Sequence, residues 1–77
     1  MKKWTNIEGS TYSDGHGNHI RWAGVGDYGW SIYELTIEVD GKSYIWNLRE
    51  CCGIREAIEH ADKLIAKLES GWRPVNW

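Results

Sequence analysis

The sequence contains no phenylalanine, one proline and two cysteines, and these shortages narrow what the chain can be. Because Cys51 and Cys52 are neighbours, they cannot build the disulfide framework that holds many small secreted domains together. We expect two reduced thiols, one facing the core and one facing away from it. No apolar run approaches the roughly 18–20 residues of a membrane span, and no signal-peptide pattern is present. We therefore expect a cytoplasmic protein without a membrane partner.

Positive charge is also scarce, because 9 lysines and arginines stand against 11 aspartates and glutamates, for a formal net charge of -2. Such a balance gives no overall positive field to attract phosphates. Nucleic acid is therefore not the expected partner.

Tryptophan, by contrast, is abundant for a chain of 77 residues. A chain of this length forms one domain, here 1–77, with a small core. Each buried indole removes a large apolar area from water, so we expect most of the tryptophans to lie in the core. They are Trp4, Trp22, Trp30, Trp46, Trp72 and Trp77.

The clearest pattern runs from Trp30 to Asn47, where two alternating segments flank Asp40-Gly41. An Asp-Gly pair favours a two-residue type I′ turn between antiparallel strands. A slip of one residue would mix polar side chains into an apolar face, so the pattern specifies one register. The predicted pairs are Val39–Lys42, Ile37–Tyr44, Leu35–Trp46 and Tyr33–Leu48.

Alternation before this hairpin predicts two more strands, at about 3–8 and 18–23. Between them lies Asp14 to Asn18, a run of residues that suit turns. Ile20 and Trp22 are expected to face inward. The glycine-rich segment 23–29 is followed by a strand and not by a helix, so it lacks the helix N-terminus that completes a phosphate-binding loop.

After the hairpin the apolar period changes from two to 3.6, which predicts a helix at about 53–70. Asn47 with Glu50 would form a capping pair for a helix beginning at Leu48; the alternative is a start at Gly53 or Ile54. Gly71 suits the end of the helix. The predicted fold is α+β: an antiparallel sheet of three to four strands (about 3–8, 18–23, 30–39 and 42–47) with one C-terminal helix packed on one face.

Few residues of the sequence indicate a metal-binding or catalytic site. Asp14, His16 and His19 are metal-ligand types that lie close together, but they sit in a turn and no Cys-x-x-Cys pair accompanies them. No sequence pattern brings Cys51 or Cys52 to a histidine and an acid as a nucleophilic set would require. We therefore expect no metal site, no cofactor and no enzymatic activity.

Two resemblances carry further expectations. The run YELTIEVDGKSYIWNLRECCGIREAIEHADKLIAKLE resembles the strand–strand–helix end of a double-stranded-RNA-binding domain. That family places a lysine cluster at the start of its last helix to meet phosphates. The corresponding stretch here is CCGIREAIEH, in which Arg55 is the only basic residue apart from His60. The resemblance implies nucleic-acid binding as the alternative function, and the departure falls on the residues that would bind.

The second resemblance covers most of the chain. It rests on Trp4, the run Tyr12-Ser-Asp-Gly15, Ile20-Arg21, Gly29-Trp30, Asp40-Gly41-Lys42 and Leu48 before an alanine-containing helix. These features are similar to those of small uncharacterised proteins carried by bacteriophages. The resemblance implies a non-enzymatic binding module in the cytoplasm of a bacterial host, acting on a host protein, for example as an inhibitor of a defence system.

The hairpin also predicts where such a partner would bind. With one helix to cover one face of the sheet, the other face should stay open. By the alternation of side chains along the strands, the apolar residues Trp30, Ile32 and Ile45 lie on that side, within a polar surface. The polar residues that ring them are Glu34, Glu38 and Arg21. Apolar centres with polar rims are where binding energy concentrates. We expect these residues to bind a host protein, with a second copy of the chain as the alternative partner.

Overall fold

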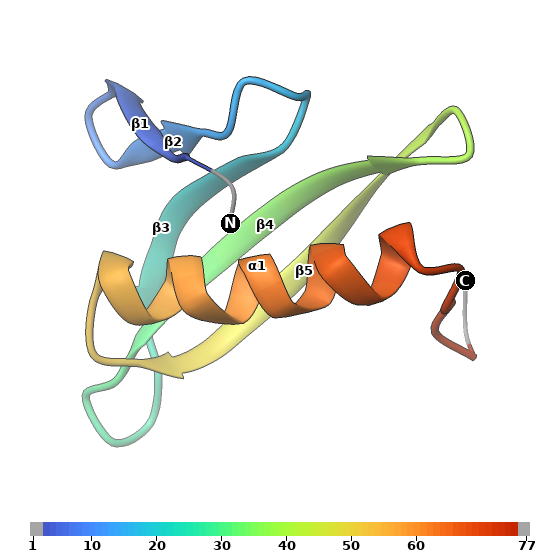
Figure 1. The fold of residues 1–77 in the computed structure, drawn as a ribbon. Helices are drawn as coiled ribbons and strands as arrows, with labels where there is room; N and C mark the ends of the chain where they lie inside the picture. The colour runs from blue at the N-terminus through green and yellow to red at the C-terminus, as the bar shows by residue number, and fades with distance from the viewer. Residues whose placement is uncertain (1–2, 76–77) are drawn as a thin grey trace.

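The computed structural model describes residues 3–75; for residues 49 and 50 it describes the backbone only. Within this range the chain forms five antiparallel strands in one sheet and then one helix. The elements are β1 Thr5–Glu8, β2 Thr11–Ser13, β3 His19–Val25, β4 Ser31–Val39, β5 Lys42–Cys51 and α1 Ile54–Glu69. Each strand pairs with its neighbour in sequence, so β1 and β5 form the two edges (Figure 1). The fold is α+β as predicted, with one strand more than expected.

The additional strand is β2. Glu8 pairs with Thr11, so Gly9 and Ser10 form a two-residue turn between β1 and β2. Gly9 has a φ of 51°, a value that glycine adopts without steric cost. β2 then pairs with β3 through Tyr12 and Ile20. Where the sequence predicts two strands, the chain thus forms the three-stranded meander β1–β2–β3.

The register of the central hairpin is confirmed. Tyr33 pairs with Leu48, Leu35 with Trp46, Ile37 with Tyr44 and Val39 with Lys42. Asp40 and Gly41 have φ values of 53° and 76°, and a type I′ turn requires positive φ at both positions. The Asp-Gly turn therefore sets which residues of β4 and β5 share a face.

The strand β5 continues beyond its predicted end, as far as Cys51. A bulge lies between the pairs Tyr33–Leu48 and Ser31–Cys51, so β5 carries one extra residue there. The bulge turns Cys51 onto the covered face of the sheet, where it is completely buried, while Cys52 is exposed, as the sequence predicted for the two thiols. The helix begins at Ile54 after Gly53, so the proposed start at Leu48 is wrong.

The core lies between α1 and one face of the sheet, because α1 crosses the sheet over β4 and β5 (Figure 1). The buried side chains of the sheet come from β3, β4 and β5, and α1 contributes the apolar stripe predicted from its period. The core residues are Ile20, Tyr33, Leu35, Ile37, Leu48, Cys51, Ala57, Ala61, Leu64, Ile65 and Leu68. No helix within residues 3–75 is long and apolar enough to cross a membrane.

The expectation that most tryptophans are core residues is wrong. Trp4 and Trp46 pack against the core but are only partly buried, and Trp77 lies outside the described residues. As predicted, Ile20 and Trp22 lie on the covered face, opposite Leu35 and Tyr33, but Trp22 remains 45% exposed. A 16-residue helix is roughly 24 Å long, so it covers only part of the sheet and leaves large side chains at the periphery in contact with water.

The C-terminal end of α1 closes as predicted. The backbone N–H of Trp72 donates to Lys67 O, that of Gly71 donates to Leu68 O, and Gly71 has a φ of 101°. These two bonds and the positive φ make a Schellman motif. Beyond it, Arg73 donates to both carboxylate oxygens of Asp40 at 3.1 Å, which ties the end of the helix to the β4–β5 turn.

A hydrogen bond also joins the start of the chain to the helix. Trp4 Nε1 donates to Asp62 Oδ1 at 2.9 Å, while Asp62 Oδ2 is buried without a hydrogen-bond partner in the described part of the chain. We expect Trp4→Phe to lower the free energy of unfolding by about 1–2 kcal/mol, because it removes a donor that offsets the burial of this carboxylate. Urea denaturation of the single and double variants with Asp62→Ala measures the coupling. If Trp4→Phe lowers the free energy of unfolding by the same amount in the Asp62→Ala variant as in the parent, the hydrogen bond contributes nothing to stability.

Candidate functional site

The face of the sheet opposite α1 is not covered by any described element. We call it the open face; its side chains include His19, Arg21, Ile32, Glu34, Thr36 and Ile45, as the strand pairing shows. Ile45 lies halfway along β5, an edge strand of the sheet, and is 65% exposed. Trp30 immediately precedes β4 at the same parity as Ile32 and is 42% exposed.

The open face is arranged in cross-strand rows. Ile45 pairs with Thr36, which pairs with His19. The next row joins Asn47, Glu34 and Arg21. Within it, the Arg21 guanidinium lies 2.6 Å from Glu34 Oε1 through Nη2, and Nε donates to the same oxygen at 2.9 Å. This ion pair stands between Ile45 and Ile32, so it divides the apolar residues and does not ring them.

The two apolar parts of the open face differ in character. Ile45 lies between the row of Glu34 and that of the exposed Glu38, so acidic side chains flank it along β4. Ile32 is only half-exposed, because it pairs with Gly24 and lies against Gly26 of the β3–β4 loop. Tyr28 in this loop is exposed as well, and sequence reasoning did not single it out. The apolar residues predicted for the interface thus lie in two separate places. Ile45 is on β5, whereas Trp30 and Ile32 lie beside the β3–β4 loop.

The turn between β2 and β3 uses its polar residues internally. Asp14 Oδ1 accepts hydrogen bonds from the backbone N–H of His16 at 2.8 Å and of Asn18 at 3.2 Å, and Oδ2 accepts from Asn18 Nδ2 at 2.7 Å. Asn18 Oδ1 in turn accepts from Glu38 N. Three donors thus satisfy the Asp14 carboxylate, which closes the turn. Through Asn18 the turn is also attached to β4.

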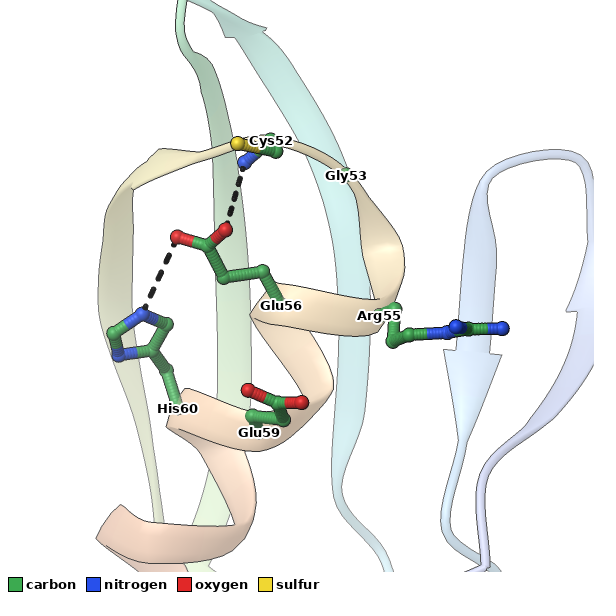
Figure 2. A pocket seen from close by; sticks show the side chains of 6 residues that line it. All are labelled: Cys52, Gly53, Arg55, Glu56, Glu59 and His60. Atoms are coloured by element: carbon green, nitrogen blue, oxygen red, sulfur yellow. Dashed lines mark hydrogen bonds and ion pairs between the residues drawn. The ribbon is translucent and has the colours of Figure 1, made fainter.

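A cleft of about 570 Å³ lies where β5 passes into α1 (Figure 2). It is lined by Cys52, Gly53, Arg55, Glu56, Glu59 and His60. Figure 2 shows the Glu56 carboxylate between the main chain of Cys52 and the His60 ring, while Arg55 points away. Glu56 Oε2 accepts from Cys52 N at 3.5 Å, and Glu56 Oε1 lies 3.8 Å from His60 Nε2.

The pKa values of both thiols next to this cleft are raised. Burial, followed by the nearby charge of Glu56, raises the pKa of Cys51. Partial desolvation and a hydrogen bond with Glu56 likewise raise the pKa of Cys52. A thiol acts as a nucleophile only as the thiolate, so neither cysteine is activated for covalent catalysis in this environment.

No protein family, curated protein or solved structure matches the chain.

Proposed function

We propose that the protein is a small non-enzymatic binding module that docks on another protein through its open face. The observation that carries the proposal is the position of Ile45, which is largely exposed halfway along the edge strand β5, on the sheet face opposite α1. Exposed apolar side chains occurring singly are ordinary. Here, however, Ile45 pairs with Thr36 and has Glu34 and Glu38 in nearby rows of β4, so an apolar side chain at the sheet edge has polar and acidic neighbours, as at an interface rim.

The side chains of the open face indicate what kind of partner surface would be complementary to it. Arg21 and Glu34 neutralise each other, whereas Glu38 is an exposed acid beside the row of Ile45. A fitting partner offers an apolar pocket or patch for Ile45 with a basic group at its rim. The resemblance to small phage proteins makes a bacterial host protein, such as a component of a defence system, the partner that we propose. The chain would then act as an inhibitor or modulator.

Nucleic-acid binding of the double-stranded-RNA-binding type is the alternative. Its phosphate contacts would lie at the start of the last helix, where Glu56 and Glu59 line the cleft and Arg55 points away from it (Figure 2). Two carboxylates at this position repel phosphates. This arrangement favours a protein partner.

We expect Ile45→Glu to abolish partner binding while leaving the free energy of unfolding within about 1 kcal/mol of the parent, because the side chain is mostly in water. Tagged protein is incubated with nuclease-treated bacterial lysate, and the retained proteins are identified by mass spectrometry. Light scattering of the pure protein shows whether the partner is a second copy.

Val75→Glu is the matched control, since Val75 is 98% exposed in the C-terminal tail and the change of charge is the same. Support for the proposal is a protein retained by the parent and by Val75→Glu, lost by Ile45→Glu and insensitive to salt. Retention that nuclease or moderate salt removes would instead favour the nucleic-acid alternative. Equal retention by all three proteins would leave the open face without this role.

A further inference from the structure

A set of three different metal-ligand side chains meets where β5 joins α1. One potential ligand atom each of Cys51, Glu56 and His60 lies within 4.8 Å of the others. Cys51 comes from the last position of β5, while Glu56 and His60 lie four residues apart on α1. A spacing of four places both side chains on one side of a helix, one turn apart. The set thus brings together two elements and three donor types: sulfur, oxygen and nitrogen.

We propose that Cys51, Glu56 and His60 bind a divalent transition-metal ion, Zn²⁺ in the first place, with a water molecule as the fourth ligand. Thiolate, imidazole and carboxylate are the three side-chain ligands that Zn²⁺ takes in proteins. This site replaces the expectation from sequence that no metal is bound. It is separate from the open face and does not depend on the function proposed for that face.

The geometry needs little adjustment. A point equidistant from three atoms about 4.8 Å apart lies about 2.8 Å from each, whereas zinc bonds measure about 2.0–2.3 Å, so each ligand moves by less than about 1 Å. Glu56 and His60 are partly or largely exposed and can rotate by this amount. Cys51 is fixed by burial, so it sets the position of the ion.

Metal binding exchanges a proton for the ion. In the structure the Cys51 thiol donates to Leu48 O at a sulfur–oxygen distance of 3.8 Å. When the S–H bond breaks, the proton goes to solvent and the sulfur lone pair binds the metal. His60 binds as neutral imidazole and Glu56 as carboxylate, so the ion replaces the His60–Glu56 contact with two bonds to itself. No electron is transferred.

The surroundings leave a place for the fourth ligand. The cleft beside Glu56 and His60 is open to solvent and wide enough for water (Figure 2). Cys52 and Glu59 also line this cleft, but the three ligands that converge are Cys51, Glu56 and His60. The ion would stabilise the β5–α1 junction, where Gly53 precedes the helix and provides no side-chain cap.

Cobalt and zinc titrations test the site. The metal-free, phosphine-reduced protein is titrated with CoCl₂, and ZnCl₂ is then used to displace the cobalt. We expect one equivalent to bind, an intense visible spectrum of tetrahedral Co²⁺, and a thiolate-to-cobalt charge-transfer band in the near ultraviolet. Because the ligands are assembled only in the native state, zinc should also raise Tm by several degrees at a hundredfold excess over Kd.

Matched variants assign the ligands. Cys51→Ala should remove the charge-transfer band, and Glu56→Gln and His60→Gln should each weaken binding about tenfold or more. Cys52→Ser, Glu59→Gln and His16→Gln should bind as the parent does. Since Glu56 and His60 are not core residues, their variants decide the question even if Cys51→Ala fails to fold.

Three results would overturn the proposal. The first is a parent protein whose spectrum and Tm do not respond to either metal. The second is a charge-transfer band that survives in Cys51→Ala or disappears in Cys52→Ser, since the sulfur ligand would then be the wrong one. The third is unchanged affinity in both Glu56→Gln and His60→Gln, which would reduce the site to a single thiolate.

Discussion

Leu35→Ala is expected to lower the free energy of unfolding by about 3–4 kcal/mol. Leu35 is completely buried on β4, opposite Trp46, and its truncation removes apolar contacts and leaves a cavity under α1. A domain of this size has a total stability of roughly 4–12 kcal/mol, so the variant loses a large share of it. Urea denaturation followed by tryptophan fluorescence and far-ultraviolet circular dichroism measures the change.

Ile45→Ala is the control for this prediction. It removes a branched aliphatic side chain from the same hairpin, but from the open face, where Ile45 is mostly in contact with water. We expect a cost below about 1 kcal/mol. A slip of one residue in the hairpin would exchange the two faces, so a larger cost for Ile45→Ala than for Leu35→Ala would show that the register is wrong.

The central hairpin and the helix could be predicted because local residues specify them. Asp40-Gly41 adopts the two positive φ values that its turn type demands, and this fixes the pairing of β4 with β5 from Val39–Lys42 as far as Tyr33–Leu48. The helix ends at Gly71 for an equally local reason, the Schellman motif. Both signals lie within a few residues of the feature that they determine.

The features that sequence reasoning missed depend on contacts between distant segments. Gly9-Ser10 is a turn pair, but Thr11–Ser13 is too short to show alternation, and it becomes a strand by pairing with β3. Cys51 lies three residues before Ile54, a helical spacing, yet pairing with Ser31 keeps it in β5. The exposure of Trp22 follows from how far α1 reaches across the sheet, which residue spacing does not encode.

In the candidate sites, too, some features follow from local sequence and others depend on contacts between distant segments. The parity of β4 and β5 alone predicts that Ile32 and Ile45 share a face, whereas the ion pair between them depends on the position of Arg21 on β3. The Cys51–Glu56–His60 set was missed because the sequence does not predict that β5 extends to Cys51 or that a bulge turns Cys51 toward α1. The spacing of Glu56 and His60, four residues apart and just after two cysteines, was the signal that could have found it.

Asp14→Ala is expected to lower the free energy of unfolding by about 3 kcal/mol at pH 7. The substitution removes the acceptor for the backbone N–H of His16 and for two donors of Asn18, and Asn18 is buried. Buried donors left without a partner cost about 1–3 kcal/mol each. Freed from Asp14, the Asn18 side chain also loses the orientation in which its oxygen accepts from Glu38 N. Urea denaturation measures the loss.

The dependence of this loss on pH distinguishes the carboxylate from a purely steric effect. Burial alone would raise the pKa of Asp14, but the hydrogen bonds from Asn18 and His16 together hold it below its ordinary value. The native carboxylate therefore contributes its full stability above the ordinary value of about 3.9, and loses it as the pH falls through the lower native pKa. The gap between the parent and Asp14→Ala should accordingly narrow below about pH 4.

The exposed Asp27, in the β3–β4 loop, provides the control for this titration. Asp27→Ala removes the same charge from the chain, so it shares any general effect of net charge on acid unfolding but breaks no turn that holds β2 and β3 to β4. We expect it to change the free energy of unfolding by less than about 0.5 kcal/mol at pH 7. If the gap between the parent and Asp14→Ala keeps its full size down to pH 2, the ionised carboxylate is not what closes this turn, and the side chain of Asp14 acts by shape alone.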